Sequence, residues 1–187
     1  MANIQAGNIK NGTIFMYDGN IFKVIEFQHV KPGKGPAFVR TKLRNVRTGA
    51  IIEKTLNPAE KVEEIELSIR QMQYIYEADD MYYLMDTETY EQIGMTETQM
   101  SDALKYIKEN MEVTVVSYDG EIIEVRPPMF VILEVTYTEP GFAGNTATTS
   151  GKPATLENGL TVSVPLFVKI GDKVKVDTRT GYYVERV

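Results

Sequence analysis

The 187-residue sequence contains no cysteine, which excludes several classes of function at once. Disulfide bonds, thiolate zinc sites and cysteine nucleophiles all require a thiol. Tryptophan is also absent, and His29 is the only histidine. A catalytic histidine works with a nucleophile and an orienting carboxylate, and no motif in the sequence supplies that set. We therefore expect His29 to have a packing role and the chain to be no enzyme.

Long hydrophobic runs are missing as well. No apolar stretch approaches the roughly 20 residues that a membrane-spanning helix requires. The N-terminal residues do not combine a basic start with an apolar stretch, so we expect no signal peptide. Hydrophobic residues make up 43% of the chain and charged residues 25%, which is ordinary for a soluble globular protein. We expect a cytoplasmic monomer without a membrane partner.

The charge is unevenly distributed. The formal net charge of −6 argues against a general nucleic-acid binder. Residues 31–54, however, hold seven basic side chains and one acid, whereas residues 55–112 hold four basic and fourteen acidic side chains. Such blocks often serve solubility alone. The alternative is a local phosphate contact by a protein that otherwise repels nucleic acid.

Short strands separated by turn signals dominate the sequence. Asp18-Gly19 and Asp119-Gly120 are strong signals for tight hairpins. Strands are expected at 13–17, 21–27, 37–44, 50–55, 66–76, 81–86, 113–118, 121–126, 130–137, 160–168, 173–177 and 182–187. Residues 141–153 are rich in Gly, Thr and Ser and are expected to form a long loop. The sequence thus predicts an all-β protein.

Turn and helix signals divide the chain into three units, at residues 1–64, 65–128 and 129–187. Pro127-Pro128 forms the second junction, because proline stops a strand. The middle unit contains one helical stripe, in which Thr96 and Gln99 form a candidate capping box. The apolar positions of the stripe are Met100, Leu104, Ile107 and Met111. Strands interrupted by one short helix are typical of small barrels such as the oligonucleotide-binding (OB) fold.

No metal or cofactor site is expected. Asp79-Asp80 is a pair of carboxylates, but no further ligands stand at ion-binding spacing around it. We interpret the pair as a hairpin turn. Residues 141–144 (GFAG) lack the Gly-Lys-Ser/Thr ending of a phosphate-binding loop.

The loop around Lys34 is the most informative segment. Its palindrome, Pro32-Gly33-Lys34-Gly35-Pro36, lies between two expected strands and is interpreted as a hairpin tip. Proline fixes φ and stiffens the flanks, whereas glycine presents no side chain. The result is a narrow loop with one long amine, a common target of modification. Spacing alone also allows an ordinary turn.

The strand after this loop has one basic face. Arg40, Lys42 and Arg44 alternate with residues of the opposite face, which is typical of a half-buried strand. Together with Lys31, these side chains are candidates for phosphate contacts beside whatever the tip reaches.

The sequence resembles the elongation factor P family over its whole length. The matching strings follow the order of the family: 30–38 (VKPGKGPAF), 42–44 (KLR), 47–49 (RTG), 53–55 (EKT), 85–92 (MDTETYEQ), 151–156 (GKPATL), 164–168 (VPLFV) and 171–181 (GDKVKVDTRTG). The resemblance implies an SH3-like (KOW-type) first domain and two OB folds, arranged in an L shape similar to tRNA.

The resemblance also implies a function. The family binds the ribosome between the peptidyl and exit sites and relieves stalling at consecutive prolines. Its implied partners are the 23S and 16S rRNA and the P-site peptidyl-tRNA. The tip residue of the family falls on Lys34, which we expect to contact the CCA end in the peptidyl-transferase centre. Some family members carry an enzymatic extension on this lysine, so Lys34 is a candidate modification site and a Lys34-modifying enzyme a candidate partner. Because other members with a Pro-Gly-Lys-Gly-Pro loop work unmodified, we favour an unmodified Lys34.

At the C-terminus, the family's ribosome-contacting Tyr and Arg fall on Tyr183 and Arg186. Residues 146–156, including Thr146, Gly151 and Lys152, match the loop that faces the small subunit. This sequence departs from the family at Asn145, where an Asp is expected, and at 148–150 (TTS), where more glycine is expected.

Two other functions remain open on the sequence. A general RNA-binding module would use its OB folds, but it needs exposed aromatics on a basic face, and the middle unit is acidic. An enzyme acting on a small substrate would need a catalytic constellation that the sequence does not show.

Overall fold

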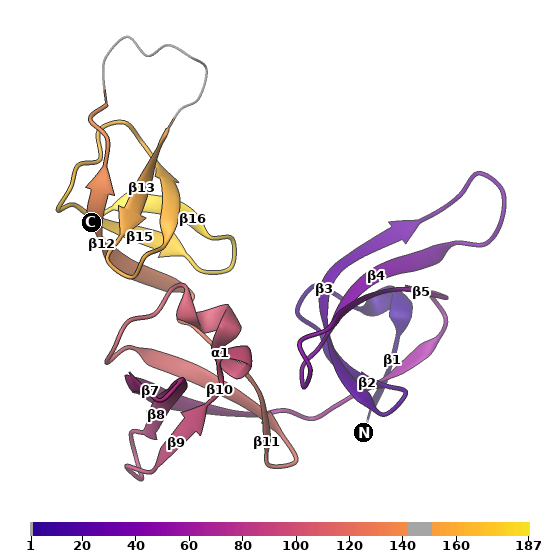
Figure 1. Cartoon of the computed structure of the whole chain (residues 1–187). Helices are drawn as coiled ribbons and strands as arrows, with labels where there is room; N and C mark the ends of the chain where they lie inside the picture. Colours follow the sequence, from indigo (N-terminus) through magenta and orange to yellow (C-terminus); the bar gives the residue numbers. More distant parts are fainter. Residues whose placement is uncertain (1, 142–150) are drawn as a thin grey trace. The chain divides into compact units, whose positions relative to one another are not determined.

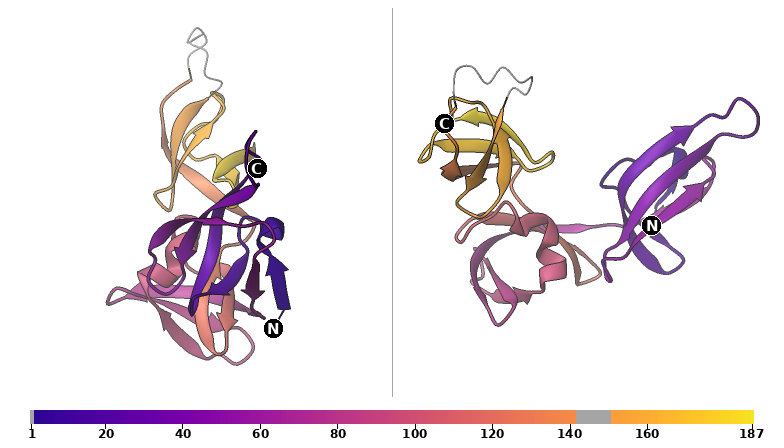
Figure 2. Two further views of the ribbon diagram at one scale, coloured as in Figure 1. Left: turned by 90° about the vertical axis from the view of Figure 1, so that its right-hand side faces the viewer. Right: turned by 45° about the horizontal axis from the view of Figure 1, so that its top comes forward.

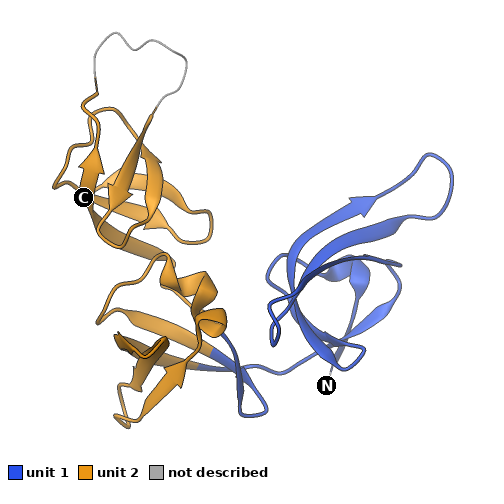
Figure 3. Ribbon diagram, viewed as in Figure 1, with its two compact units in different colours: residues 1–69, 116–124 blue, residues 70–115, 125–187 orange. Residues whose placement is uncertain are grey.

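The computed structural model describes residues 2–141 and 151–187. The described residues form three sheets, with one α-helix and one short 3-10 helix. The chain divides into two compact units (Figure 3), of which unit 1 comprises Met1–Ile69 and Val116–Glu124 and unit 2 comprises Arg70–Val115 and Val125–Val187. The prediction of an all-β protein with one short helix is confirmed.

The first sheet has six strands in the order β1-β6-β2-β3-β4-β5 (Figure 1). Their bounds are β1 Ala2–Gln5, β2 Ile14–Tyr17, β3 Asn20–Val30, β4 Phe38–Asn45, β5 Ile51–Leu56 and β6 Lys61–Glu64, with the 3-10 helix η1 at Ala6–Asn8. The sequence pattern does not predict β1 and β6. Each has only four residues, and the two strands pair with each other although they lie far apart in the sequence, with Ala2 opposite Glu64.

Strand β4 shows the predicted alternation. Val39, Thr41 and Leu43 are buried, whereas Arg40 is exposed. The buried Thr41 hydroxyl donates a hydrogen bond to the carbonyl of Lys54 at 2.6 Å, which satisfies its polar group inside the sheet. Leu43 joins Phe15 in a core cluster that contains no basic side chain.

The second sheet has the order β11-β10-β7-β8-β9. Its strands are β7 Ser68–Ala78, β8 Met81–Asp86, β9 Gln92–Met95, β10 Glu112–Tyr118 and β11 Glu121–Arg126. Asp119 and Gly120 have φ values of 50° and 79°, the left-handed pair that tight hairpins require. Asp79 and Asp80 form the predicted turn in the same way, with φ values of 53° and 61° and no glycine.

The helix α1, Glu97–Leu104, begins with the predicted capping box, in which Thr96 and Gln99 bond each other's backbone. The prediction of one helical stripe to Met111 is wrong, because the helix ends at Leu104. Two contacts explain the early end. The carbonyl of Lys105 accepts a hydrogen bond from Asn158 Nδ2 at 2.8 Å, and the side chain of Tyr106 is buried in the core of the third sheet.

The third sheet has the order β14-β13-β12-β15-β16. Its strands are β12 Phe130–Thr138, β13 Lys152–Leu156, β14 Thr161–Val164, β15 Lys173–Asp177 and β16 Tyr182–Arg186. The strand expected at 160–168 is shorter than predicted, because Pro165 follows β14 and proline cannot donate to the ladder. Leu133, Leu156 and Val174 are central to the core of this sheet.

The helices of the described residues are too short and too polar to cross a membrane.

Candidate functional site

The segment 31–37 forms the tip of the β3–β4 hairpin, as predicted. The two strands pair from Phe22 and Asn45 at one end to Val30 and Phe38 at the other. Figures 1 and 2 show that the tip projects beyond the barrel of unit 1. The Lys34 side chain is exposed, and within the described part of the chain it makes no hydrogen bond or ion pair. Its amine is therefore free to reach an external ligand.

The backbone of the tip combines one constrained and one open position. Gly35 adopts φ +106°, a conformation that side chains rarely take, whereas Gly33 lies outside this region. A Cβ atom at Gly35 would lie 4.0 Å from Cγ of Pro32, and nothing surrounds the equivalent position of Gly33. Pro36 is exposed. The tip is thus slim on both sides of Lys34, which suits entry into a narrow space.

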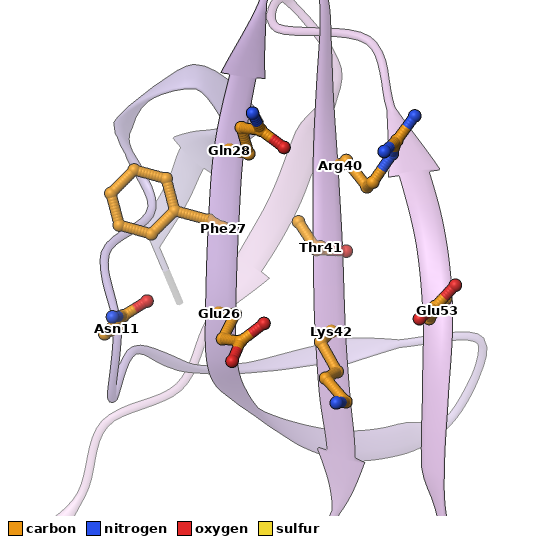
Figure 4. Close-up of a pocket in the computed structure, with 8 residues that line it drawn as sticks. All are labelled: Asn11, Glu26, Phe27, Gln28, Arg40, Thr41, Lys42 and Glu53. Atoms are coloured by element: carbon orange, nitrogen blue, oxygen red, sulfur yellow. The ribbon is translucent and has the colours of Figure 1, made fainter.

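The predicted basic face lies on the outside of β3, β4 and β5. It includes a shallow pocket of about 360 Å³, shown in Figure 4. The residues that line the pocket are Asn11, Glu26, Phe27, Gln28, Arg40, Thr41, Lys42 and Glu53. In Figure 4 the side chain of Gln28 points toward β4, the side chain of Arg40 extends toward β5, and Glu26 points toward Lys42.

The cross-strand register distinguishes the two cations of this pocket. Lys42 stands between Glu26 on β3 and Glu53 on β5, so its charge has carboxylates on both sides. Arg40 stands between Gln28 and a threonine, and it is exposed. A planar guanidinium with neutral cross-strand neighbours is the better hydrogen-bond donor to a phosphate group, so Arg40 is the stronger candidate of the two.

The other two candidate phosphate contacts have different surroundings. Lys31 is exposed at the end of β3, next to the tip. Arg44 is half-buried and lies opposite Lys23 in the register of β3 and β4. The structure therefore places Lys31 and Arg40 on the surface near Lys34, and it places Arg44 lower on the barrel.

Lys152 occupies an unexpected position. Its side chain is buried, with 9% exposure, and its Nζ atom donates a hydrogen bond of 2.5 Å to the carbonyl of Glu139. Gly151 is also closely packed, because a Cβ atom at this position would lie only 2.8 Å from Ser163 Oγ. Both residues hold β13 against its neighbours, and the ammonium of Lys152 does not face solvent. Thr146 and the departures at 145 and 148–150 lie outside the described residues.

Tyr183 and Arg186 are both on β16, where they play different parts. Tyr183 is partly buried and packs against the core of the third sheet. The guanidinium of Arg186 lies over the ring of Phe167, with 4.9 Å to the ring centroid, and forms an ion pair of 3.6 Å with Asp172. The exposed Phe167 was not predicted from the sequence, although Pro165 inside the strand expected at 160–168 is a signal against a continuous strand there.

Two ion pairs of unit 1 were also missed. Lys23 Nζ lies 2.7 Å from the carboxylate of the buried Glu124, and Arg47 forms two hydrogen bonds of 2.9 Å with Glu121. The hydrogen bonds between Arg47 and Glu121 lower the pKa of the carboxyl and raise the pKa of the guanidinium. No sequence signal identifies partners that are this far apart in the chain.

No group of three or more His, Asp or Glu side chains in the described ranges is placed to hold a metal ion. The pKa of Asp86 is lowered because the backbone amides of Glu88 and Thr89 donate to its carboxylate, with a further contribution from Arg70. This carboxylate closes the turn after β8.

Comparisons with known proteins identify the family. Residues 5–62 match the elongation factor P KOW-like domain, residues 67–125 match the elongation factor P OB domain, and residues 131–186 match the elongation factor P C-terminal domain.

Relatives at the level of the whole chain agree. An elongation factor P of Thermoanaerobacter sp. (strain X514) is 58% identical over 98% of this chain and its own full length. One of Acetivibrio thermocellus is 56% identical over the same shares. The solved structure of a eukaryotic translation initiation factor 5A from Methanococcus jannaschii is 24% identical, with a TM-score of 0.50. It covers 66% of this chain and 93% of its own length, and it supports the fold alone. The chain belongs to the elongation factor P family of translation factors.

Proposed function

We propose that this chain binds the ribosome between the peptidyl and exit sites and stimulates peptide-bond formation at stalled consecutive prolines. The proposal rests on membership of the family and on one observation, the exposed Lys34 at the end of a projecting hairpin. Its partners are the 23S and 16S rRNA and the P-site peptidyl-tRNA. We further propose that the factor acts as a monomer of three domains, at 1–64, 65–128 and 129–187.

The mechanism that the geometry supports is positioning. Lys34 Nζ contacts the CCA end of the peptidyl-tRNA and holds a productive geometry, while the ribosome supplies the reaction centre. A misplacement of about 1 Å can cost about 100-fold in rate, so a modest contact is sufficient. No proton transfer by the factor is required, and the factor contributes no catalytic residue of its own.

The remaining surfaces would support docking. Lys31 and Arg40 lie exposed beside the tip and would contact phosphates, whereas Tyr183, Arg186 and the loop that precedes Lys152 would face the small subunit. We propose that Lys34 works without modification, because the proline-flanked loop already stiffens the tip. An intact-mass spectrum of the native protein tests this point, and added mass on Lys34 would refute it.

The central test is translation of a triproline reporter in an extract that lacks the factor. Wild-type protein is expected to relieve the stall, and Lys34→Ala is expected to lose about 10-fold or more of that rate. Lys10→Ala is the matched control, since Lys10 is another exposed lysine of unit 1 outside the site. Equal relief by wild type and Lys34→Ala would contradict the proposal.

A further inference from the structure

Unit 1 contains a hairpin from a distant part of the sequence. Val116–Glu124, which include the turn between β10 and β11, pack with the barrel that carries Lys34. A hydrophobic cluster joins the two parts. Its buried members are Ile14, Ile21, Ile65, Val116 and Ile123, none of which is more than 5% exposed. This cluster is a shared core, and the hairpin and the barrel belong to one compact unit.

Two ion pairs surround that core, and each anchors one side of the Lys34 hairpin. Lys23, near the base of β3, bonds Glu124 at 2.7 Å. Arg47, two residues beyond the end of β4, bonds both carboxylate oxygens of Glu121 at 2.9 Å. A bidentate pair fixes the relative orientation of its two partners as well as their distance.

We infer that the 116–124 hairpin is a brace that sets the direction of the β3–β4 hairpin, with Lys23, Arg47, Glu121 and Glu124 as positioning residues for Lys34. This inference rests on the proposed function. It adds to that function a structural reason why the long β3–β4 hairpin holds the amine of Lys34 at a defined position.

The length of the arm makes its base angle important. Lys23 and Val30 are seven positions apart on β3, a span of about 23 Å at 3.3 Å per residue. A tilt of about 3° at Lys23 therefore moves the start of the tip by about 1 Å. Because a displacement of about 1 Å can cost about 100-fold in rate, small changes at the base affect the reaction strongly.

The test uses charge reversal at the exposed pair. The variants are Arg47→Glu, Glu121→Arg and the double variant Arg47→Glu/Glu121→Arg, with Lys34→Ala as reference. Exposed ion pairs contribute little to folding stability, so all variants are expected to fold. Glu185→Lys is the control, because the exposed Glu185 forms an ion pair with Lys175 in unit 2. Circular dichroism melting curves verify the folded state of each protein.

Two readouts separate an effect on the position of Lys34 from an effect on ribosome binding and from an effect on folding stability. The first is the maximal rate of triproline synthesis at saturating factor, together with the factor concentration that gives half of it. The second is the electron–electron distance distribution between spin labels on Ala37→Cys and Ser117→Cys. The absence of native cysteine makes this labelling specific.

We expect each single reversal to broaden the distance distribution and to lower the maximal rate by about 5-fold or more, at a nearly unchanged half-maximal concentration. The double variant is expected to recover both values to within about 2-fold of wild type. Identical distance distributions in all variants, or no recovery in the double variant, would overturn the brace. If the distances behave as expected but Lys34→Ala is as active as wild type, the proposed function fails and the brace remains.

Discussion

The basic side chains of this protein differ in where their charged groups lie, and this location decides which of them can bind an external anion. The amine of Lys34 lies in solvent, the guanidinium of Arg40 lies on an open face, and the buried Lys152 donates its ammonium to the carbonyl of Glu139. All three residues are basic, and all three are candidates for the contacts that the proposed function requires. Only the first two are placed to meet an external anion, because a buried ammonium is already committed to its internal acceptor.

The burial of Lys152 leads to a stability prediction. Lys152→Met keeps the apolar stem but removes the ammonium that donates a part-buried, charge-assisted hydrogen bond to the carbonyl of Glu139. We expect the free energy of unfolding to fall by about 1–3 kcal/mol. Urea denaturation followed by circular dichroism measures the change. Lys173→Met, at an exposed lysine of the same sheet, is the control, and an equal effect at both positions would argue against a structural role for Lys152.

At the scale of elements, the tight turns of three β-hairpins differ in how they reach the left-handed backbone conformation. The turns at Asp18-Gly19 and Asp119-Gly120 combine an aspartate and a glycine in left-handed conformations. The Asp79-Asp80 turn reaches the same geometry without glycine, and the left-handed region is costly for residues with a Cβ atom. The β7–β8 hairpin therefore carries strain at its second turn position, Asp80, where the other two hairpins have a glycine.

Asp80→Gly is expected to relieve this strain. Glycine takes the left-handed conformation at no steric cost, so the free energy of unfolding should rise by about 1 kcal/mol. Thermal unfolding at neutral pH measures the shift. Asp80→Ala keeps the Cβ atom and serves as the matched control, and a gain of the same size in that variant would show that charge repulsion, not backbone strain, is relieved.

At the scale of the whole molecule, the charge distribution restricts where RNA can bind. The chain is acidic overall, yet seven basic residues and a single acid fall within 31–54. The structure places Arg40 of this segment on an open face beside the tip and surrounds Lys42 with carboxylates. Under the proposed function, we expect RNA to bind at this patch and to be repelled by the acidic remainder of the chain.

Ribosome binding should consequently depend on salt through a small number of phosphate contacts. We expect Arg40→Ala to weaken binding and to reduce the slope of log affinity against log salt by about 1. Affinity for ribosomes with an empty exit site, measured over a series of KCl concentrations, provides the slope. Lys10→Ala should leave the slope unchanged, and the same would hold for Arg40→Ala if Arg40 contacted no phosphate.

The amino-acid sequence by itself determined the elements that depend on neighbouring residues. Alternation located β4 and its basic face, Asp-Gly pairs located two hairpin turns, and the Pro-Gly palindrome located the tip that carries Lys34. These patterns are local, because strand period, turn conformation and proline geometry are properties of a few consecutive residues.

The tertiary structure alone decided which distant residues meet. Arg47 and Glu121 are 74 positions apart, and Lys23 and Glu124 are 101 positions apart, so no periodicity connects them. The same holds for Lys152, which begins β13 within the loop expected at 141–153 and whose ammonium bonds the carbonyl of Glu139. It also holds for Tyr106, whose burial in the core of the third sheet ends the helix early. Each depends on packing between segments that local patterns do not relate.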